Sequence, residues 1–186
     1  MSITKTQILP GHFYHIYNRG INKQTIFKTK SNYHFFLNKM KHFFTDKIDV
    51  YTYCLMPNHF HFLIYINTKS EKPYLAYSHL LNSYTQAFNR QEKKKGPIFE
   101  GKIKRKIITD EKYNYQLICY IHHNPIHHGF SEYKNYPWSS YKSFLSNQPT
   151  LLKRMKVLEW FGDIEQFITI HDQQSDLRKI RDWIID

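Results

Sequence analysis

Apolar and polar residues alternate along the first part of the chain in a way that predicts β-strands. The segment GHFYHIYNRG, residues 11–20, alternates with a period of two and ends at a glycine, which is typical of a strand. DVYTYCLM and HFHFLIYI, at 49–56 and 59–66, read as two strands joined by a short Pro-Asn turn and predict a hairpin. FEGKIKRKII, at 99–108, is a fourth strand-like segment.

Apolar residues at helical spacing predict helices between these strands. The segment at 31–44 has this spacing, with Ser31 or Asn32 as the expected N-cap. The segment at 73–90 begins with Pro73, a favoured first residue of a helix. A third helix is expected from about residue 111 to residue 123, because Pro125 should stop it.

The order of these elements predicts the fold. Strand, helix, strand, strand, helix, strand, helix is the order of a ferredoxin-like split βαβ fold, an α+β class with an antiparallel sheet and helices on one face. We expect residues 1–145 to form one domain. Residues 146–186 contain a further amphipathic stretch, which predicts a C-terminal helical extension of one or two helices packed on that domain.

Charge is distributed unevenly along the 186 residues. The chain has 27 Lys and Arg against 15 Asp and Glu, a net charge of +12; residues 1–158 carry +16 and residues 159–186 carry −4. A segment as basic as residues 1–158 attracts polyanions, of which nucleic acid is the usual one. The alternative is that the charge only maintains solubility. The acidic tail could mask the basic body until DNA arrives, a hypothesis that deletion of residues 159–186 would test.

The chain lacks the signals of membrane insertion and export. It has no run of eighteen apolar residues, and its start, MSITKTQILPGHF, has no signal-peptide pattern. We therefore expect no membrane partner and a cytoplasmic location. Cys54 and Cys119 lie in apolar segments and are expected to be free thiols.

Two histidines stand in the apolar strand at 59–66. Because strand side chains alternate between faces, Phe60 and Phe62 should lie under the helices while His59 and His61 point to the opposite face. Two imidazoles at this spacing can chelate one divalent metal ion if a third ligand comes from elsewhere. The spacing is a weak motif, and two ordinary half-buried polar residues are the alternative. A histidine-triad hydrolase is less well supported, since Leu63 occupies the third position.

The third predicted helix ends in LICYIHHNPIHHG, residues 117–129. Tyr120 and Asn124 lie one turn apart on one face of it, with His123 beside them. A phenol next to an amide oxygen would place a nucleophile beside a metal ligand. Tyr120 could equally be a core residue in line with Tyr113 and Leu117, since the chain has 15 tyrosines.

The sequence resembles the REP-associated tyrosine transposases, which belong to the HUH (His-hydrophobic-His) single-strand transposases with one catalytic tyrosine. The resemblance covers residues 11–145, and five blocks agree with the family in order and spacing. The blocks are GHFYHIYNRGINKQTIF, MPNHFHFLI, GPIFEGKIKRKII, YIHHNPIHHG and YPWSSYKSF.

The resemblance implies roles for individual residues. His59 and His61 match the metal-binding pair, Asn124 matches the position that completes the metal site, and Tyr120 matches the nucleophile. The expected cofactor is Mg²⁺ or Mn²⁺. His123 stands where the family commonly has an apolar residue, so it is a candidate for an additional metal ligand.

The implied reaction is transesterification of single-stranded DNA through a 5′-phosphotyrosine link, at hairpin or repeat elements. Tyr84, on the second predicted helix, is a rival nucleophile that ranks below Tyr120. Two other functions stay open: a catalytically silent single-strand DNA-binding protein of the same fold, and a metal-dependent nuclease that uses water. The resemblance also implies association with the nucleoid, and some relatives form homodimers.

A basic cluster is the expected DNA-binding surface. Residues 90–106 carry eight basic and two acidic side chains, and on the predicted strand Lys102, Lys104 and Lys106 should share one face. Rows of this kind suit phosphate contacts, which give affinity with little sequence information. The residues expected to contact DNA are Arg19, Lys93, Lys94, Lys95, Lys102, Lys104, Arg105 and Lys106.

Overall fold

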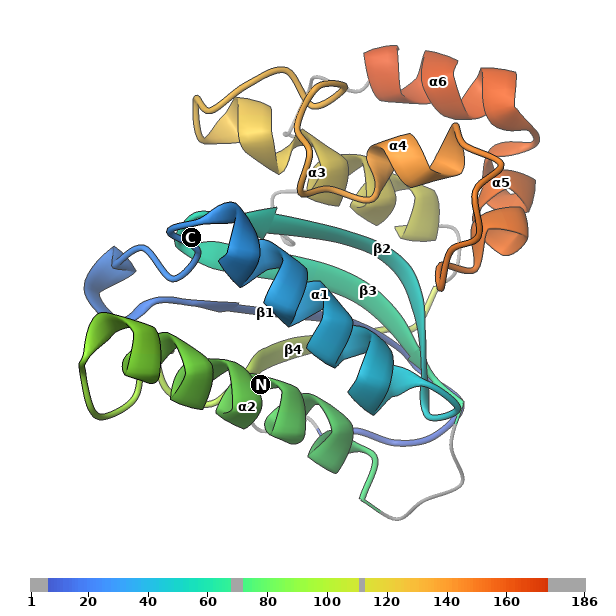
Figure 1. Ribbon diagram of the computed structural model, residues 1–186. Coiled ribbons are helices and arrows are strands. Elements are labelled where there is room, and N and C mark those ends of the chain that lie inside the picture. Colours follow the sequence, from blue (N-terminus) through green and yellow to red (C-terminus); the bar gives the residue numbers. More distant parts are fainter. Residues whose placement is uncertain (1–6, 68–71, 111–112, 174–186) are drawn as a thin grey trace.

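A four-stranded antiparallel sheet forms the centre of the molecule (Figure 1). The computed structural model describes residues 7–67, 72–110 and 113–173. The sheet has the order β2-β3-β1-β4, so β2 and β4 are its edge strands. Its strands are β1 (Phe13–Arg19), β2 (Ile48–Met56), β3 (His59–Ile66) and β4 (Lys104–Ile108).

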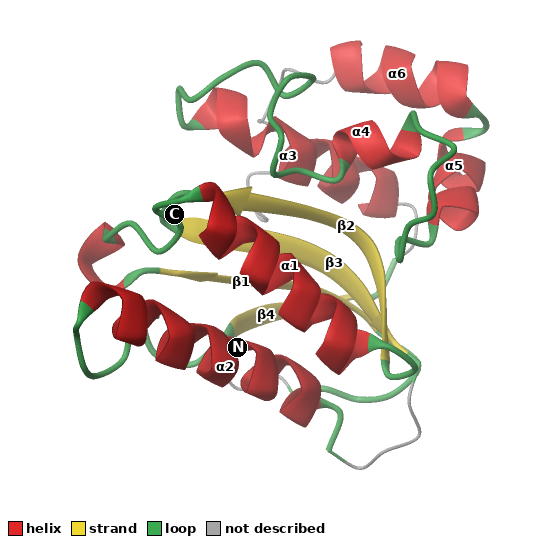
Figure 2. Ribbon diagram, in the orientation of Figure 1, coloured by secondary structure: helices red, strands yellow, loops and turns green. Residues whose placement is uncertain are grey.

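Helices cover both faces of the sheet (Figures 1 and 2). α1 (Lys30–Phe44) and α2 (Tyr74–Glu92) pack side by side on one face, and α3 (Asn114–His127) packs on β2 and β3 across the other. The remaining helices are a short 3-10 helix (Ile21–Lys23), α4 (Tyr141–Phe144), α5 (Arg154–Phe161) and α6 (Ile164–Gln173). The predicted ferredoxin-like α+β fold is therefore confirmed, with the two helices of the split βαβ unit on one face. The expectation that the helices lie on one face only is wrong for the third helix, which packs on the other face, where β2 and β3 also bury side chains.

The alternation predicted for β3 is present in the structure. Phe36 of α1 packs against Phe60 and Phe62, with ring centroids 5.3 and 6.2 Å apart. His61 lies on the opposite face, where its ring meets Tyr120 of α3. The two faces of β3 thus separate the apolar core under α1 and α2 from a polar floor under α3.

Two predicted boundaries are wrong. α1 begins at Lys30 because Thr29 is its N-cap: the Asn32 backbone N–H donates to Thr29 Oγ1 and the Thr29 N–H donates to Asn32 Oδ1. The strand predicted at 99–108 begins only at Lys104. The chain turns at Gly101, whose φ of +61° lies in the left-handed region and ends any extended segment.

The C-terminal extension forms two helices, α5 and α6, separated at Gly162. Two of its described acidic residues make ion pairs: Glu159 with Lys156 in the same helix at 3.1 Å, and Asp172 of α6 with Lys134, outside the extension, at 2.6 Å. Residues 174–186 lie outside the described part of the chain, so the masking hypothesis stays a prediction.

Two smaller expectations can be compared with the structure. Cys54 and Cys119 are buried free thiols, as predicted. None of the helices in the described ranges is long and apolar enough to cross a membrane.

Candidate nucleophile and metal site

α3 crosses the sheet so that Tyr120 faces the histidines of β3. The Tyr120 side chain is 3% exposed, and its ring stands edge-on to His61, with centroids 5.7 Å apart. It is also edge-on to His15 of β1 at 6.3 Å, and stacks on His127 at 6.0 Å. The tyrosine and the histidine pair, 59 residues apart in sequence at their nearest, therefore meet in one chain.

Pro125 helps to orient Asn124. The prediction that Pro125 stops the helix is wrong, because α3 continues through it to His127. Proline has no N–H to donate to the carbonyl of Ile121, four residues earlier. The Asn124 side-chain Nδ2 lies 3.4 Å from that carbonyl and donates to the Tyr120 carbonyl at 3.0 Å. With its nitrogen held by the helix, the Asn124 amide presents its oxygen toward β3.

That oxygen faces a ring nitrogen of His59. The His59 Nε2 atom lies 3.2 Å from Asn124 Oδ1, and the His59 Nδ1 atom lies 2.6 Å from Asn58 Oδ1. Asn58 Oδ1 can only accept, so the ring proton of neutral His59 belongs on Nδ1, and Nε2 presents a lone pair to a second acceptor. Two acceptors in contact repel each other unless a proton or a cation lies between them. Acceptors that converge in this way are a property of metal sites.

His61 is held by His15. The His61 Nδ1 atom lies 2.9 Å from His15 Nε2, so Nε2 of His61 is the nitrogen left for a ligand. Burial, followed by the nearby histidines, holds the pKa of His61 well below its ordinary value, and burial lowers the pKa of His15 to about 3. Both rings are therefore neutral at physiological pH, the form in which imidazole binds metals. Among the described residues no three His, Cys, Asp or Glu side chains form a metal cluster.

The histidines line a cavity of about 230 Å³ with a basic rim. Arg19, Lys23 and Lys104 contribute cations to it. Glu100 forms an ion pair with Arg19 and lies 3.8 Å from Lys104, and the hydrogen bond from Arg19 lowers the pKa of the Glu100 carboxyl. A cavity with this charge suits a phosphodiester more than a cationic or neutral ligand.

Two candidates from the sequence lie elsewhere. His123 packs against the Tyr133 ring at 4.4 Å and lies near His171 of α6, with ring centroids 5.8 Å apart. Tyr84 is buried on the other face of the sheet, where its hydroxyl donates to the carbonyl of Ile26. The structure therefore brings Tyr120, and not Tyr84, to the histidine pair.

The predicted DNA-binding residues divide between the two sides of the sheet. Lys104 and Lys106 pair with Tyr17 and His15 in the register and share their face. Lys102 was expected on that face, but it lies outside β4 and lines a cavity on the α2 side together with Arg105. The three lysines at 93–95 are exposed in the turn that follows α2.

Several site residues were missed by the sequence reading. His15 and Tyr17 line up with His61 because β1 pairs with β3, and burial raises the pKa of Tyr17 to about 12, so its phenol stays protonated. His128 reaches the cavity from the end of α3, with its ring 4.6 Å from that of His59. Alternation in β1 put His15 and Tyr17 on one face, but only the strand register shows which residues that face meets.

Comparisons with known proteins agree with the resemblance seen in the sequence. A protein of Haemophilus influenzae described as a REP-associated tyrosine transposase is 23% identical over 129 residues, which span 61% of this chain and 73% of that protein. The solved structure of a REP-associated tyrosine transposase bound to a REP hairpin superposes with a TM-score of 0.67 at 14% identity, over 80% of this chain and 89% of that one. No family model matches the chain. The predicted resemblance is thus confirmed in sequence and, with the solved structure, in fold.

Proposed function

We propose that this chain is a tyrosine transposase that cuts and rejoins single-stranded DNA at hairpin or repeat elements. The observation that carries the proposal is the meeting of α3 with β3. The Tyr120 ring lies 5.7 Å from that of His61, and Asn124 Oδ1 lies 3.2 Å from His59 Nε2. The likeness to a transposase solved with a REP hairpin supports DNA as the partner.

The proposed cofactor is Mg²⁺ or Mn²⁺, held by His59, His61 and Asn124. The converging acceptors fit a divalent ion, although two imidazoles and an amide would also accept Zn²⁺. When bound, such an ion polarises the scissile phosphate and offsets the charge that develops on it.

Tyr120 is the proposed nucleophile. Its hydroxyl oxygen forms a bond to phosphorus while the bond from phosphorus to the 3′ oxygen breaks; the phenol loses its proton and the 3′ oxygen gains one. A 3′-hydroxyl later attacks the phosphotyrosine in the reverse sense and releases Tyr120. Because the link conserves the energy of the phosphodiester, rejoining needs no nucleotide cofactor. Arg19, Lys23 and Lys104 would hold the neighbouring phosphates.

One chain supplies the tyrosine, both histidines and the amide, so cleavage itself does not require a second copy. Formation of a homodimer, and a cytoplasmic, nucleoid-associated location, stay predictions.

A covalent-adduct assay tests the proposal. End-labelled hairpins from DNA flanking the gene would be incubated with the protein and Mn²⁺ or Mg²⁺, then run on a denaturing gel. We expect a metal-dependent adduct that disappears in Tyr120→Phe and in His61→Ala. Tyr84→Phe is the matched control, because it removes the hydroxyl of a buried helical tyrosine on the other face of the sheet.

Each contrary result favours a named alternative. An adduct that survives Tyr120→Phe but not Tyr84→Phe would make Tyr84 the nucleophile. Metal-dependent cleavage without an adduct would indicate a nuclease that uses water. Hairpin binding with neither cleavage nor adduct would indicate a catalytically silent DNA-binding protein.

A further inference from the structure

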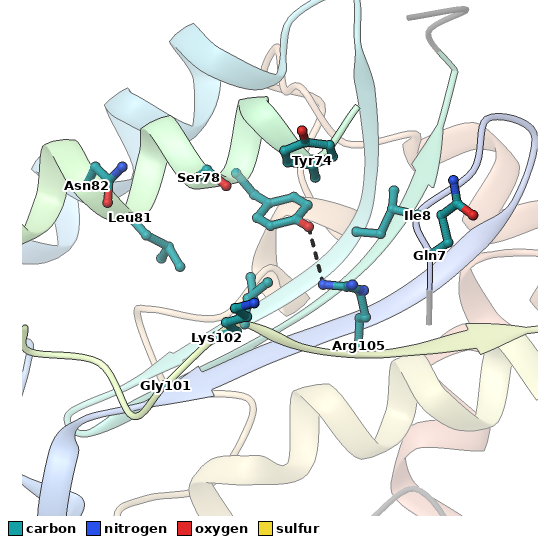
Figure 3. A pocket seen from close by; sticks show the side chains of 11 residues that line it. Gln7, Ile8, Tyr74, Ser78, Leu81, Asn82, Gly101, Lys102 and Arg105 are labelled. Carbon is teal, nitrogen blue, oxygen red and sulfur yellow. Dashed lines mark hydrogen bonds between the residues drawn. The ribbon is translucent and has the colours of Figure 1, made fainter. Parts of the chain in front are cut away.

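A second cavity lies on the α2 side of the edge strand β4 (Figure 3). It has a volume of about 640 Å³ and is bordered by α2 on one side and by Lys102 and Arg105 on the other. A neighbouring cavity of about 420 Å³ shares Leu81, Asn82 and Gly101 with it and extends to Gly96. Both cavities are lined by α2, and we call the two together the α2 groove.

One face of α2 supplies a wall of the α2 groove. Tyr74, Ser78, Asn82 and Gln86 all line it and follow one another at intervals of four residues, so they lie in a row along the helix. Twelve residues of helix span about 18 Å. The row presents one aromatic ring, 42% exposed at Tyr74, followed by a hydroxyl and two amides that can both donate and accept hydrogen bonds.

In the first cavity the opposite wall carries two cations, Lys102 and Arg105, beside the apolar Ile8 and Ile103. Lys102 is exposed at the cavity, and the Arg105 Nη1 atom lies 3.5 Å from the Tyr77 hydroxyl, which helps to hold the guanidinium there. No acidic side chain is among the described residues that line either part of the groove. A ring, amides and cations in one groove match an unpaired nucleotide strand, whose bases stack and form hydrogen bonds while its phosphates meet the cations.

The α2 groove and the histidine cavity are separated by the strand β4 and the segment before it. Lys104 lines the histidine cavity, whereas Lys102 and Arg105 line the α2 groove. Because β4 is an edge strand of the sheet formed by the described residues, a strand of DNA can pass around this edge from one cavity to the other. The alternation of β4 therefore gives the edge cations on both of its faces.

We propose that the α2 groove binds a few unpaired nucleotides of the same DNA whose phosphodiester lies at Tyr120. The inference rests on the proposed function for the position of the scissile phosphate. It adds a second single-strand binding site on the α2 side of the sheet, away from the nucleophile. This site would hold the DNA on one side of the cleavage point, while the histidine cavity would bind the phosphodiester that is cleaved.

Photo-crosslinking from the α2 groove tests this inference directly. Cys54 and Cys119 are both buried, so a cysteine introduced at Asn82 can be labelled selectively with an azidophenacyl crosslinker. The background is Tyr120→Phe, so the assay measures contact and does not depend on cleavage. The matched control is Lys142→Cys, an exposed position on α4. Irradiation with end-labelled oligo(dT) of 5 to 25 nucleotides should crosslink Asn82→Cys once the strand is long enough, and Lys142→Cys at background level.

Two variants give an independent measure of affinity. Tyr74→Ala should weaken binding of the longer strands by about fivefold or more through lost base stacking. Lys102→Gln should reduce the salt slope of single-strand binding by about 0.7 through one lost phosphate contact.

The inference would be overturned by equal crosslinking from positions 82 and 142. It would also be overturned if Tyr74→Ala and Lys102→Gln both left the affinity and the salt slope unchanged. Either result would leave a peptide as the better occupant of the groove. A crosslink from position 82, combined with no adduct when the chain with Tyr120 intact is incubated with the hairpins and metal, would support the groove while contradicting the tyrosine transposase. The two proposals can therefore fail separately.

Discussion

His15 is the residue that determines which nitrogen His61 can offer to a ligand. For His61 to present a lone pair on Nε2, its proton must lie on Nδ1 and be donated to His15 Nε2, 2.9 Å away. With His15 Nε2 accepting, the proton of neutral His15 lies on Nδ1, which is buried and has no hydrogen-bond partner within the described ranges. Partners of this kind fix the tautomer and orientation of metal-binding histidines.

Replacing His15 should therefore weaken metal binding without removing any metal ligand. We expect His15→Phe to lower the affinity for Mn²⁺ by about 10- to 100-fold, because His61 Nδ1 would lose its acceptor. Calorimetric titration of the DNA-free protein with Mn²⁺ measures this. His15→Gln, which retains an acceptor, should lose less; equal affinity in the wild type and both variants would show that His15 does not position His61.

At the scale of elements, a chain of neutral side chains fastens α3 to α6. His171 Nδ1 donates to the Phe167 carbonyl at 2.7 Å, so its Nε2 accepts from His122 Nδ1 at 2.8 Å. His122 Nε2 then accepts from the hydroxyl of Thr52 or of Ser140, each 2.8 Å away. The surroundings thus fix one neutral tautomer for both rings. The helix that carries Tyr120 is held by the sheet on one side and by the C-terminal extension on the other.

This arrangement predicts a loss of stability in acid. Burial lowers the pKa of His171 to about 3 and that of His122 well below its ordinary value of about 6.5. Below pH 6.5 the unfolded chain takes up protons that the folded chain excludes, so this stability is full above about pH 6.5 and declines toward pH 3. The slope is about 1.4 kcal/mol per pH unit for each group at most. Asp172 and Lys134 are the charged groups that act on His171, in opposite directions.

Urea denaturation between pH 7.5 and pH 4.5 measures the effect, with His171→Gln as the comparison. Glutamine can accept the hydrogen bond from His122 but does not titrate, so its free energy of unfolding should fall less steeply with decreasing pH than that of the wild type. Parallel curves for the two proteins would show that His171 contributes nothing to the pH dependence.

The N-terminus of α1 offers a test at the same scale. Thr29→Ala removes the side chain that accepts from Asn32 and should lower the free energy of unfolding by about 1 kcal/mol. Thr29→Ser keeps the hydroxyl and should restore most of that stability. A Thr29→Ala protein as stable as the wild type in chemical denaturation would mean that the capping box contributes little.

At the scale of the whole molecule, the net charge is +12, and its effect on DNA binding depends on where the cationic side chains are concentrated. Arg19, Lys23 and Lys104 converge on the histidine cavity, and Glu100 offsets part of their charge. Since phosphate contacts dominate single-strand affinity, the balance between these groups should set both its strength and its salt dependence.

Glu100→Gln should therefore bind single-stranded DNA more tightly than the wild type, by several-fold at low salt, because it removes a negative charge beside the proposed phosphate position. Fluorescence anisotropy over a range of salt concentrations measures this. Glu132→Gln makes the same change of net charge at an exposed position elsewhere and should have a much smaller effect. Equal gains in the two variants would show that overall charge, and not the cavity, determines affinity.

The order of elements and the ferredoxin-like fold class followed from the sequence because periods of 2 and 3.6 residues are local properties of a segment. The same local rule put His59 and His61 on the face opposite Phe60 and Phe62. Exceptions to local rules were not predictable in this way. α3 continues past Pro125 to His127, while the Asn124 side-chain amide contacts the nearby carbonyls of the helix.

What the sequence determined by itself was therefore which side chains share a face and which residue types are available for chemistry. The tertiary structure decided which faces meet. His15 lies 46 residues from His61 in sequence, and only the register of β1 with β3 places His15 Nε2 2.9 Å from His61 Nδ1. The separation of Lys102 from Lys104 likewise depends on where β4 begins, whereas alternation along the strand already placed Arg105 opposite Lys104. Pairing across strands is a long-range property, because it is set by packing of the whole sheet and not by the local sequence of any one strand.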